Sequence, residues 1–420
     1  MTTSTAIAEK FESIVGAANV SAATTNDGVA GQQPEYVVSP ENDKELAAVL
    51  ACANEAGIGV IPRGGGTKLE WGNPLKPAAI VLSTSRLNRV LEHAWADLTV
   101  TVEAGCTMQT LQDTLAQHGQ RLALDALWPE RATIGGVLST NDSGVLRLRF
   151  GSLRDLIIGV TLALPDGTLA TSGGKVVKNV AGYDLPKLAT GALGTLGVIT
   201  RAIFRVHPLC RESLTLSFGA PSIEEMQGAV LAVQDSTLAH TALQIRCASG
   251  HPPEADILFE ATPAGLLAQK TKLQELLHGL ELRESEQRPW SAKQQLWDTN
   301  TATSAIAKLS VLPDDSAKTI RQLEKIAASN SVEWQIALQA TGIGWLCIVG
   351  ATSALKPALE QFRSHLESNK GSLALLRQPP GMSAIDAWGS PGDAISVMRA
   401  LKQQLDPNAT LNPGRFVGGI

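Results

Sequence analysis

The sequence predicts an α+β protein, and three observations support that fold class. A chain of 420 residues is long enough for two or three domains. Residues 156–164 and 168–171 form two strand-like runs on either side of the turn signal Pro165-Asp166-Gly167, which predicts an antiparallel hairpin. From residue 212 onward, the order strand, helix, strand, strand, helix occurs twice, which indicates a duplicated ferredoxin-like unit sharing one antiparallel sheet.

The elements of the N-terminal half follow from local patterns. Ser39 and Pro40 predict a helix start, apolar residues then recur at helical spacing from Leu46, and Gly57 predicts the stop. Residues 1–33 show weak periodicity, and we expect a peripheral segment with a short helix near residues 11–17. Further elements of this half are expected as strands at 58–61, 79–82, 98–102 and 198–206 and a helix at 108–115.

The C-terminal half is expected to hold two copies of one unit. The expected elements are strands at 214–218, 242–247 and 256–261 with helices at 222–234 and 263–277, then strands at 308–312, 333–339 and 345–350 with helices at 314–328 and 355–367. Residues 392–405 are amphipathic and precede a turn-rich end. We therefore divide the chain into segments 1–33, 34–210, 211–377 and 378–420.

Composition excludes several functions. The formal net charge is −5, which gives no electrostatic attraction toward nucleic acid. Five cysteines are scattered without a C-x-x-C pair, so neither a zinc site nor an iron–sulfur cluster is expected, and reduced thiols indicate the cytoplasm. No export signal is visible, and no apolar run approaches the length of a membrane span. We expect a cytoplasmic protein that reaches the inner face of the cell membrane only through partners.

A first glycine-rich motif, Arg63-Gly64-Gly65-Gly66-Thr67, follows a predicted strand. Successive glycines let main-chain N–H groups converge on an anion without obstruction by Cβ atoms, which suits a pyrophosphate. The alternative is a flexible turn. The motif is not the Rossmann fingerprint, because Leu69 stands where the third glycine would be.

Two further glycine-rich segments strengthen the interpretation. Thr133 is expected to cap a short helix that begins Ile134-Gly135-Gly136, so that bare N–H groups face a ligand, although small residues also serve close helix packing. Residues 191–199 carry glycines at intervals of three before a strand, which admits close approach of a flat ligand or marks a β-bulge. The three segments together are more specific than any one of them.

These segments, with residues 150–155 and 405–414, resemble FAD-binding proteins of the vanillyl-alcohol oxidase type, in the glycolate oxidase and D-lactate dehydrogenase branch. Residues 178–185 with 191–197 are similar to the FAD-binding subunit of bacterial glycolate oxidases. The resemblance covers residue 34 to the C-terminus. It implies a two-lobed FAD-binding domain followed by a cap domain, and it implies non-covalent FAD, because covalent relatives carry His where Gly66 stands.

The resemblance also implies where FAD lies. The pyrophosphate is expected at Gly64–Thr67, the flavin ring edge near 133–136 and 141–144, and the adenine side near 197–199. The implied cofactor-binding residues are Arg63, Gly64, Gly65, Gly66, Thr67, Thr133, Ile134, Gly135, Gly136, Ser139, Asn141, Ser143, Gly144, Gly197, Val198, Ile199 and Asn412.

Two departures from catalytic relatives bear on function. The metal-associated His-x-Gly-Asp-Gly-Asn-x-His motif is missing, and Leu193 stands in the segment where relatives carry Glu. We therefore expect no catalytic residue and no metal ligand in this chain. The resemblance implies an FAD-binding subunit of a multi-subunit glycolate (2-hydroxy-acid) dehydrogenase or oxidase, with a catalytic flavoprotein and an iron–sulfur subunit as partners. The alternatives are a self-sufficient FAD-dependent 2-hydroxy-acid dehydrogenase and a non-catalytic scaffold without flavin.

Overall fold

The computed structural model describes residues 3–175, 182–285 and 288–420, and contacts divide the chain into two compact units. The first unit comprises the chain up to Ser143, Gly151–Leu209 and Pro391–Ile420. The second comprises Gly144–Phe150 and Cys210–Ser390. The change of unit at 209/210 lies next to the boundary drawn from the sequence. Residues 378–390, which the sequence assigned to a C-terminal segment, pack with the second unit.

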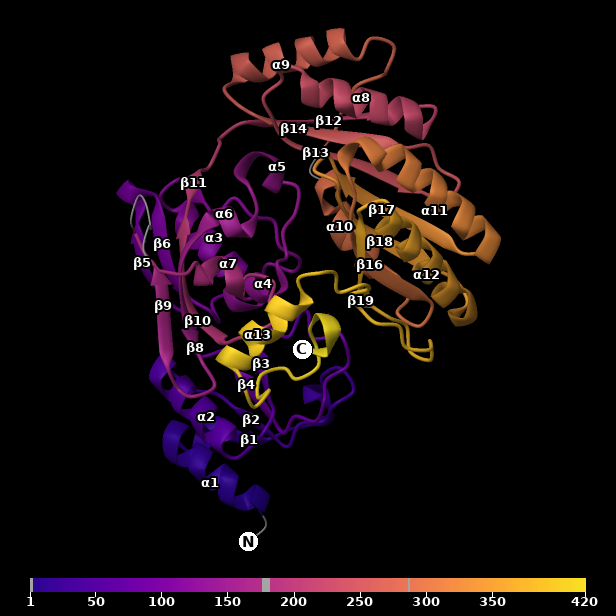
Figure 1. Cartoon of the computed structure of the whole chain (residues 1–420). Coiled ribbons are helices and arrows are strands. Elements are labelled where there is room, and N and C mark those ends of the chain that lie inside the picture. The colour runs from indigo at the N-terminus through magenta and orange to yellow at the C-terminus, as the bar shows by residue number, and fades with distance from the viewer. Residues whose placement is uncertain (1–2, 176–181, 286–287) are drawn as a thin grey trace. The chain divides into compact units, whose positions relative to one another are not determined.

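The first unit is built on two main sheets, which form its two α/β lobes (Figure 1). The four-stranded sheet has the order β1 (Val20–Ala22), β2 (Tyr36–Val38), β4 (Ile80–Ser83) and β3 (Val60–Arg63). The five-stranded sheet has the order β5 (Val90–Ala94), β6 (Thr99–Glu103), β10 (Val198–Arg205), β8 (Ile157–Ala163) and β9 (Leu169–Gly173). Strands β2, β3 and β4 are parallel, whereas β8 and β9 form the predicted antiparallel hairpin.

The N-terminal helices differ from expectation at their boundaries. Helix α1 spans Thr3–Val15 and is longer than the short helix expected near residues 11–17, because Ile7, Phe11 and Val15 form one buried stripe. Helix α2 spans Asp43–Glu55, and Asn42 is its N-cap. The Asn42 side chain accepts a hydrogen bond from Glu45 N at 2.9 Å. The prediction that the helix starts at Ser39 is therefore wrong.

The remaining helices of the first unit are short, except in the C-terminal segment. The structure has α3 (Met108–Ala116), α4 (Ile134–Thr140), α6 (Leu153–Leu156), α7 (Leu185–Ala189) and α13 (Ile395–Leu405). Helix α13 confirms the amphipathic helix expected near 392–405. No helix within the described residues is long and apolar enough to cross a bilayer.

The second unit contains one antiparallel sheet of eight strands, as the repeated order of elements predicts. Its order is β15-β12-β14-β13-β17-β18-β16-β19, so the two repeats meet at β13 and β17. Its α-helices and β-strands are α5 (Arg147–Phe150), β12 (Ser213–Gly219), α8 (Ile223–Asp235), β13 (His240–Ala248), β14 (Glu254–Glu260), α9 (Pro263–Leu276), β15 (Arg283–Glu284), α10 (Ala292–Gln295), β16 (Ser304–Ser310), α11 (Ser316–Asn330), β17 (Glu333–Gln339), β18 (Ile343–Val349), α12 (Thr352–Ser368) and β19 (Ser372–Arg377).

Helices α8, α9, α11 and α12 cover one face of this sheet (Figure 1). The core between helices and sheet includes Phe218, Phe259 and Phe362, all fully buried. The opposite face of the sheet carries polar side chains. In a two-layer protein such a face generally meets solvent or a further layer of structure. The fold class predicted from the sequence is thus confirmed.

Candidate functional site

One cavity of the first unit gathers the glycine-rich segments. Its empty space, counted together with the open solvent at its mouth, is about 770 Å³. Its described lining residues are Ile61, Pro62, Arg63, Gly64, Gly65, Gly66, Thr67, Lys68, Leu69, Thr84, Thr133, Gly135, Gly136, Ser139, Thr140, Leu193, Gly194, Val198, Ile199, Asn412 and Arg415.

The loop Gly64–Thr67 leaves β3 and forms one wall of the cavity. Over the described chain, no main-chain hydrogen bond engages the N–H groups of Gly64, Gly65, Gly66 or Thr67. Four successive donors without main-chain acceptors at a cavity wall fit an anionic ligand.

The glycines at 64 and 65 also have a packing role. A Cβ atom at Gly64 would overlap the hydroxyl of Thr133, and one at Gly65 would overlap the main-chain oxygen of Arg131. The loop therefore approaches the 131–133 segment at a distance that only glycine allows. The sequence reasoning assigned these glycines to the ligand alone, and the structure adds this second reason.

Three cationic side chains line the cavity, whereas none of its described lining residues is acidic. Arg63 Nη1 lies 2.6 Å from Asp27 Oδ1, and this contact lowers the pKa of Asp27 to about 2. Lys68 Nζ lies 3.1 Å from Asp142 Oδ2, and both side chains are buried. The positive charges at the wall favour a phosphate-bearing ligand.

The third cation, Arg415, comes from the C-terminal segment. Its Nη2 group donates hydrogen bonds to the main-chain oxygens of Leu69 and Trp71. Burial lowers the pKa of Arg415 to about 10, so the guanidinium stays charged at neutral pH. Sequence reasoning missed Arg415 because it lies more than 340 residues from the loop that it contacts.

The segment around Thr133 confirms one prediction and corrects another. Thr133 is the N-cap of α4, and its side chain accepts a hydrogen bond from Gly136 N. The first-turn N–H groups are not bare, however, because Ile134 N donates to Cys106 O at 2.9 Å and Gly135 N donates to Ala104 O at 2.8 Å. The glycines of this segment therefore form part of the cavity wall without side chains that project into it, and they do not form an anion site.

A third wall comes from the loop after α7. Leu193 and Gly194 line the cavity, and both have positive φ, at 50° and 67°. Asn412 Nδ2 donates to Leu193 O at 2.6 Å, whereas Asn412 Oδ1 is buried without a hydrogen-bond partner among the described residues. An unpaired buried acceptor beside a cavity fits a donor group on a bound ligand.

Most of the residues predicted to bind the cofactor line this one cavity. Those that do are Arg63, Gly64, Gly65, Gly66, Thr67, Thr133, Gly135, Gly136, Ser139, Val198, Ile199 and Asn412. Those absent from the lining are Ile134, Asn141, Ser143, Gly144 and Gly197. Ile134 is buried in the protein, and Gly144 packs with the second unit.

Further lining residues escaped the sequence analysis, and part of one motif cannot be placed. Residues 178–181 of the motif at 178–185 lie outside the described part of the chain. Lys68 and Leu69 could have been found from the sequence, because they directly follow the glycine motif. Leu193 and Gly194 lie within the third motif but were not selected.

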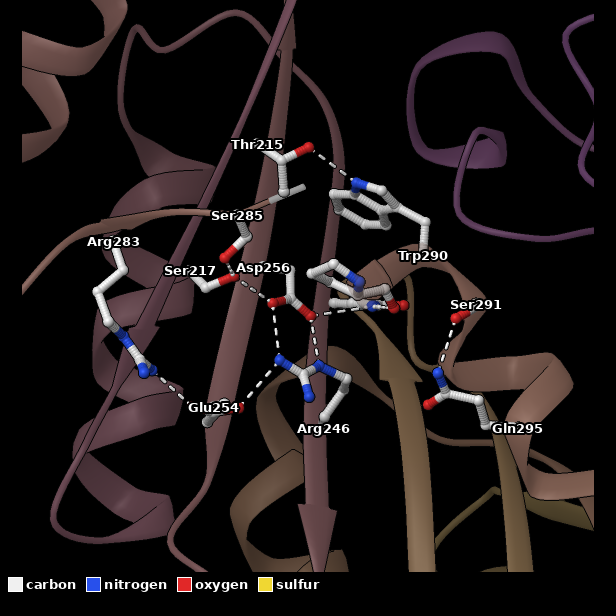
Figure 2. Close-up of polar contacts among 12 residues, drawn as sticks. Thr215, Ser217, Arg246, Glu254, Asp256, Arg283, Ser285, Trp290, Ser291 and Gln295 are labelled. Carbon is white, nitrogen blue, oxygen red and sulfur yellow. Dashed lines mark hydrogen bonds and ion pairs between the residues drawn. The ribbon is translucent and has the colours of Figure 1, made fainter. Parts of the chain in front are cut away.

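A buried polar network lies on the sheet face of the second unit opposite helices α8, α9, α11 and α12 (Figure 2). The buried carboxylate of Asp256 accepts hydrogen bonds from Ser217, Gln244 and Arg246, and Arg246 also contacts Glu254 at 3.0 Å. Asp256 is thus fully engaged with internal donors, which leaves it unsuited to act as a general base. Among the described residues, no group of three or more His, Cys, Asp or Glu could hold a metal ion.

Comparisons with known proteins agree with a cofactor-binding role of the cavity. Residues 34–173 match the family model of the FAD binding domain. The chain is 37% identical to a D-lactate dehydrogenase of Archaeoglobus fulgidus over 198 residues, which covers 47% of this chain and 44% of that protein. It is 34% identical over 183 residues to glycolate oxidase subunit GlcD of Bacillus subtilis, covering 44% of this chain and 39% of that protein. These alignments take in less than half of either relative.

A solved structure extends the likeness of the fold to the whole chain. The structure of p-cresol methylhydroxylase with bound substrate superposes with a TM-score of 0.78 at 14% identity, covering 98% of this chain and 96% of that one. The fold and the cavity define an FAD-binding protein with the vanillyl-alcohol oxidase fold. Residues 34–173 of this chain are its FAD-binding domain, and FAD is the cofactor, as the sequence predicts.

Proposed function

We propose that this chain is the FAD-binding component of an oxidoreductase that acts on a small 2-hydroxy acid such as glycolate. The observation that carries the proposal is the cavity wall, where the N–H groups of Gly64–Thr67 lie beside the guanidinium of Arg415. Arg63 and Lys68 line the same wall, and their carboxylate partners Asp27 and Asp142 are not among the lining residues. The names of the two relatives described above supply the substrate class.

The residues of this chain bind and orient the cofactor in this proposal. Gly64–Thr67 and the three cations would hold the diphosphate, and the buried Oδ1 atom of Asn412 would accept a hydrogen bond from the cofactor. The chemistry that FAD would supply when bound is the acceptance and transfer of electrons from the 2-hydroxy acid that the complex oxidises. The contribution of the protein is position, charge and exclusion of water.

We further propose that the chain works as a subunit beside a catalytic flavoprotein and an iron–sulfur protein, which link it to the membrane. The support for this arrangement is that a relative at 34% identity is itself named as a subunit.

The test is anaerobic reduction of the flavin. The purified chain, loaded with FAD, is mixed with glycolate or D-lactate while absorbance near 450 nm is followed. We expect no bleaching from the chain alone and bleaching after the partner flavoprotein is added. Rapid bleaching of the chain alone would instead establish a self-sufficient dehydrogenase. Failure to retain any FAD would contradict the proposal as a whole.

Co-purification at native expression level tests the partners separately. We expect a second flavoprotein and a cysteine-rich iron–sulfur protein to elute with this chain. A chain that elutes alone at low salt and still transfers electrons to an acceptor would contradict the subunit proposal, because weak ionic contacts persist under those conditions.

A further inference from the structure

Lys402 is a buried cation on a helix whose other side chains are half-buried or exposed. Several apolar side chains of helix α13, including Met398 and Leu401, are only half-buried. Lys402, in contrast, is buried, with 8% of its surface exposed. Lys402 Nζ lies 2.8 Å from Thr195 O, 2.6 Å from Asp406 Oδ2 and 3.1 Å from Leu411 O. An ammonium group has three donors, so these contacts satisfy all of them.

Burial of this amine is costly, which indicates a role other than stability. Desolvation lowers the pKa of Lys402, whereas the neighbouring Asp406 raises it. Replacing a buried ion pair by apolar side chains of similar volume is often neutral or stabilising. A pair of apolar side chains at 402 and 406 could therefore fill these positions without loss of stability, but it would hold neither Thr195 nor Leu411.

One end of the Lys402 contact reaches a wall of the FAD cavity. Thr195 follows Leu193 and Gly194, which line the cavity. Leu193 adopts the left-handed backbone conformation, with φ of 50°, which is unfavourable for a branched side chain. Two side chains of the C-terminal segment hold this loop, because Asn412 donates to Leu193 O and Lys402 donates to Thr195 O.

The other end of the contact reaches the segment that pairs with strand β3. Leu411 lies between Thr410 and Asn412, which pair with the first residue of β3. Val60 N donates to Thr410 O at 2.7 Å, and Asn412 N donates to Val60 O at 3.0 Å. Strand β3 leads directly into the Gly64–Thr67 loop. A single ammonium group therefore connects the loop at 193–195 with the tail that borders the phosphate-binding strand.

We infer that Lys402, with Asp406, is a positioning residue for FAD: it fixes the spacing between two walls of the cavity without lining the cavity itself. The inference rests on FAD binding in this cavity but not on the substrate or the partners of the proposed function. Asp406 supports the same geometry, since its Oδ1 accepts from Thr410 N at 2.9 Å and its Oδ2 accepts from Leu411 N at 2.8 Å.

The test compares Lys402→Met with a matched variant in the second unit. Arg363 is also a buried cation, and it donates to the main-chain oxygens of Leu373, Asp386 and Ala387. Arg363→Met removes a comparable set of contacts away from the cavity. We measure the Kd of FAD by titration of the apoprotein, the visible spectrum of the bound flavin, and the unfolding midpoint of each apoprotein. The Kd is measured well below the unfolding midpoint, so that folding does not contribute.

We expect Lys402→Met to raise the Kd of FAD about tenfold or more and to blur the fine structure of the flavin spectrum, because small shifts of a supporting contact are felt at a preorganised site. Arg363→Met is expected to leave both readouts unchanged even if its unfolding midpoint falls. Asp406→Asn, which keeps the shape of the side chain and removes its charge, is expected to raise the Kd in the same direction.

The inference is overturned if Lys402→Met and Arg363→Met change the Kd equally, or if neither changes it. Should Lys402→Met fail to fold, Asp406→Asn decides: an unchanged Kd in that variant also overturns the inference. Failure of the unsubstituted chain to bind FAD would be a failure of the proposed function, and it is seen before any variant is compared.

Discussion

Lys68 and Asp142 form a buried ion pair in the first unit, with 3.1 Å between Nζ and Oδ2 and almost no exposure of either side chain. Asp142 Oδ2 also accepts a hydrogen bond from Leu127 N at 2.8 Å. The ammonium group lies 5.8 Å and 5.6 Å from the ring centres of Trp71 and Trp128. Lys68 also lines the FAD cavity. The same side chain therefore contributes to the stability of the unit and to the positive charge of the binding site.

Breaking the pair on one side is expected to destabilise the first unit. Lys68→Met leaves the Asp142 carboxylate buried without its cation, and we expect the free energy of unfolding to fall by about 3–5 kcal/mol, measured by urea titration of the apoprotein. The control is Lys187→Met, whose 3.0 Å contact with Asp184 is half exposed and which should change the free energy by less than about 0.5 kcal/mol. Equal effects of the two substitutions would contradict the prediction.

The loop at Gly65 is expected to tolerate no side chain. In Gly65→Ala, the new methyl group overlaps Arg131 O, so the loop moves and its N–H groups leave their positions at the cavity wall. We expect the Kd of FAD to rise by about 10- to 100-fold, measured by fluorescence titration. Gly174→Ala is the control, because a Cβ atom there meets nothing within 4 Å. A Gly65→Ala variant that retains FAD as tightly as the unsubstituted chain would refute this placement.

Acid is expected to weaken the contact between Asp27 and Arg63. The hydrogen bond from Arg63 lowers the pKa of Asp27 from 3.8 to about 2, so the folded state favours the charged carboxylate. The resulting stabilisation is fully present above about pH 4 and is lost as the pH falls toward 2. Asp27→Asn should therefore lower the unfolding midpoint at pH 6 and have a diminishing effect toward pH 2. An effect of Asp27→Asn that is constant between pH 2 and 6 would show that the charge of Asp27 is not responsible.

The five cysteines are free, and we expect them to divide into two reactivity groups. Burial raises the pKa of Cys106 to about 11 and that of Cys247 to about 12, and it also raises the pKa of Cys347. Since the thiolate is the nucleophile, these three should react with a disulfide reagent at pH 8 only after unfolding. Burial also raises the pKa of Cys52, but Cys52 and Cys210 are only half-buried and should therefore react first. Mass spectrometry of the modified peptides identifies the sites, and early labelling of Cys347 would contradict the expected burial.

Much of the fold could be predicted because its signals are local. The hairpin of β8 and β9 follows from Pro165-Asp166-Gly167 between two strand-like runs, and the eight-stranded sheet follows from a repeated order of elements. The ends of helices are harder to predict, since several neighbouring residues can each serve as the N-cap. Ser39 and Asn42 are both good N-caps, and only Asn42 has the geometry to accept from Glu45 N.

The sequence by itself determined that three glycine-rich segments exist and that Thr133 caps a helix, because each of these properties depends on residues within a few positions of one another. Only the tertiary structure decided which main-chain groups remain available to a ligand. Gly135 N is taken by Ala104 O, and Lys402 meets Thr195 across 207 positions of sequence. Such contacts form when distant segments pack together, and the energy that selects them comes from burial, which a local pattern does not encode.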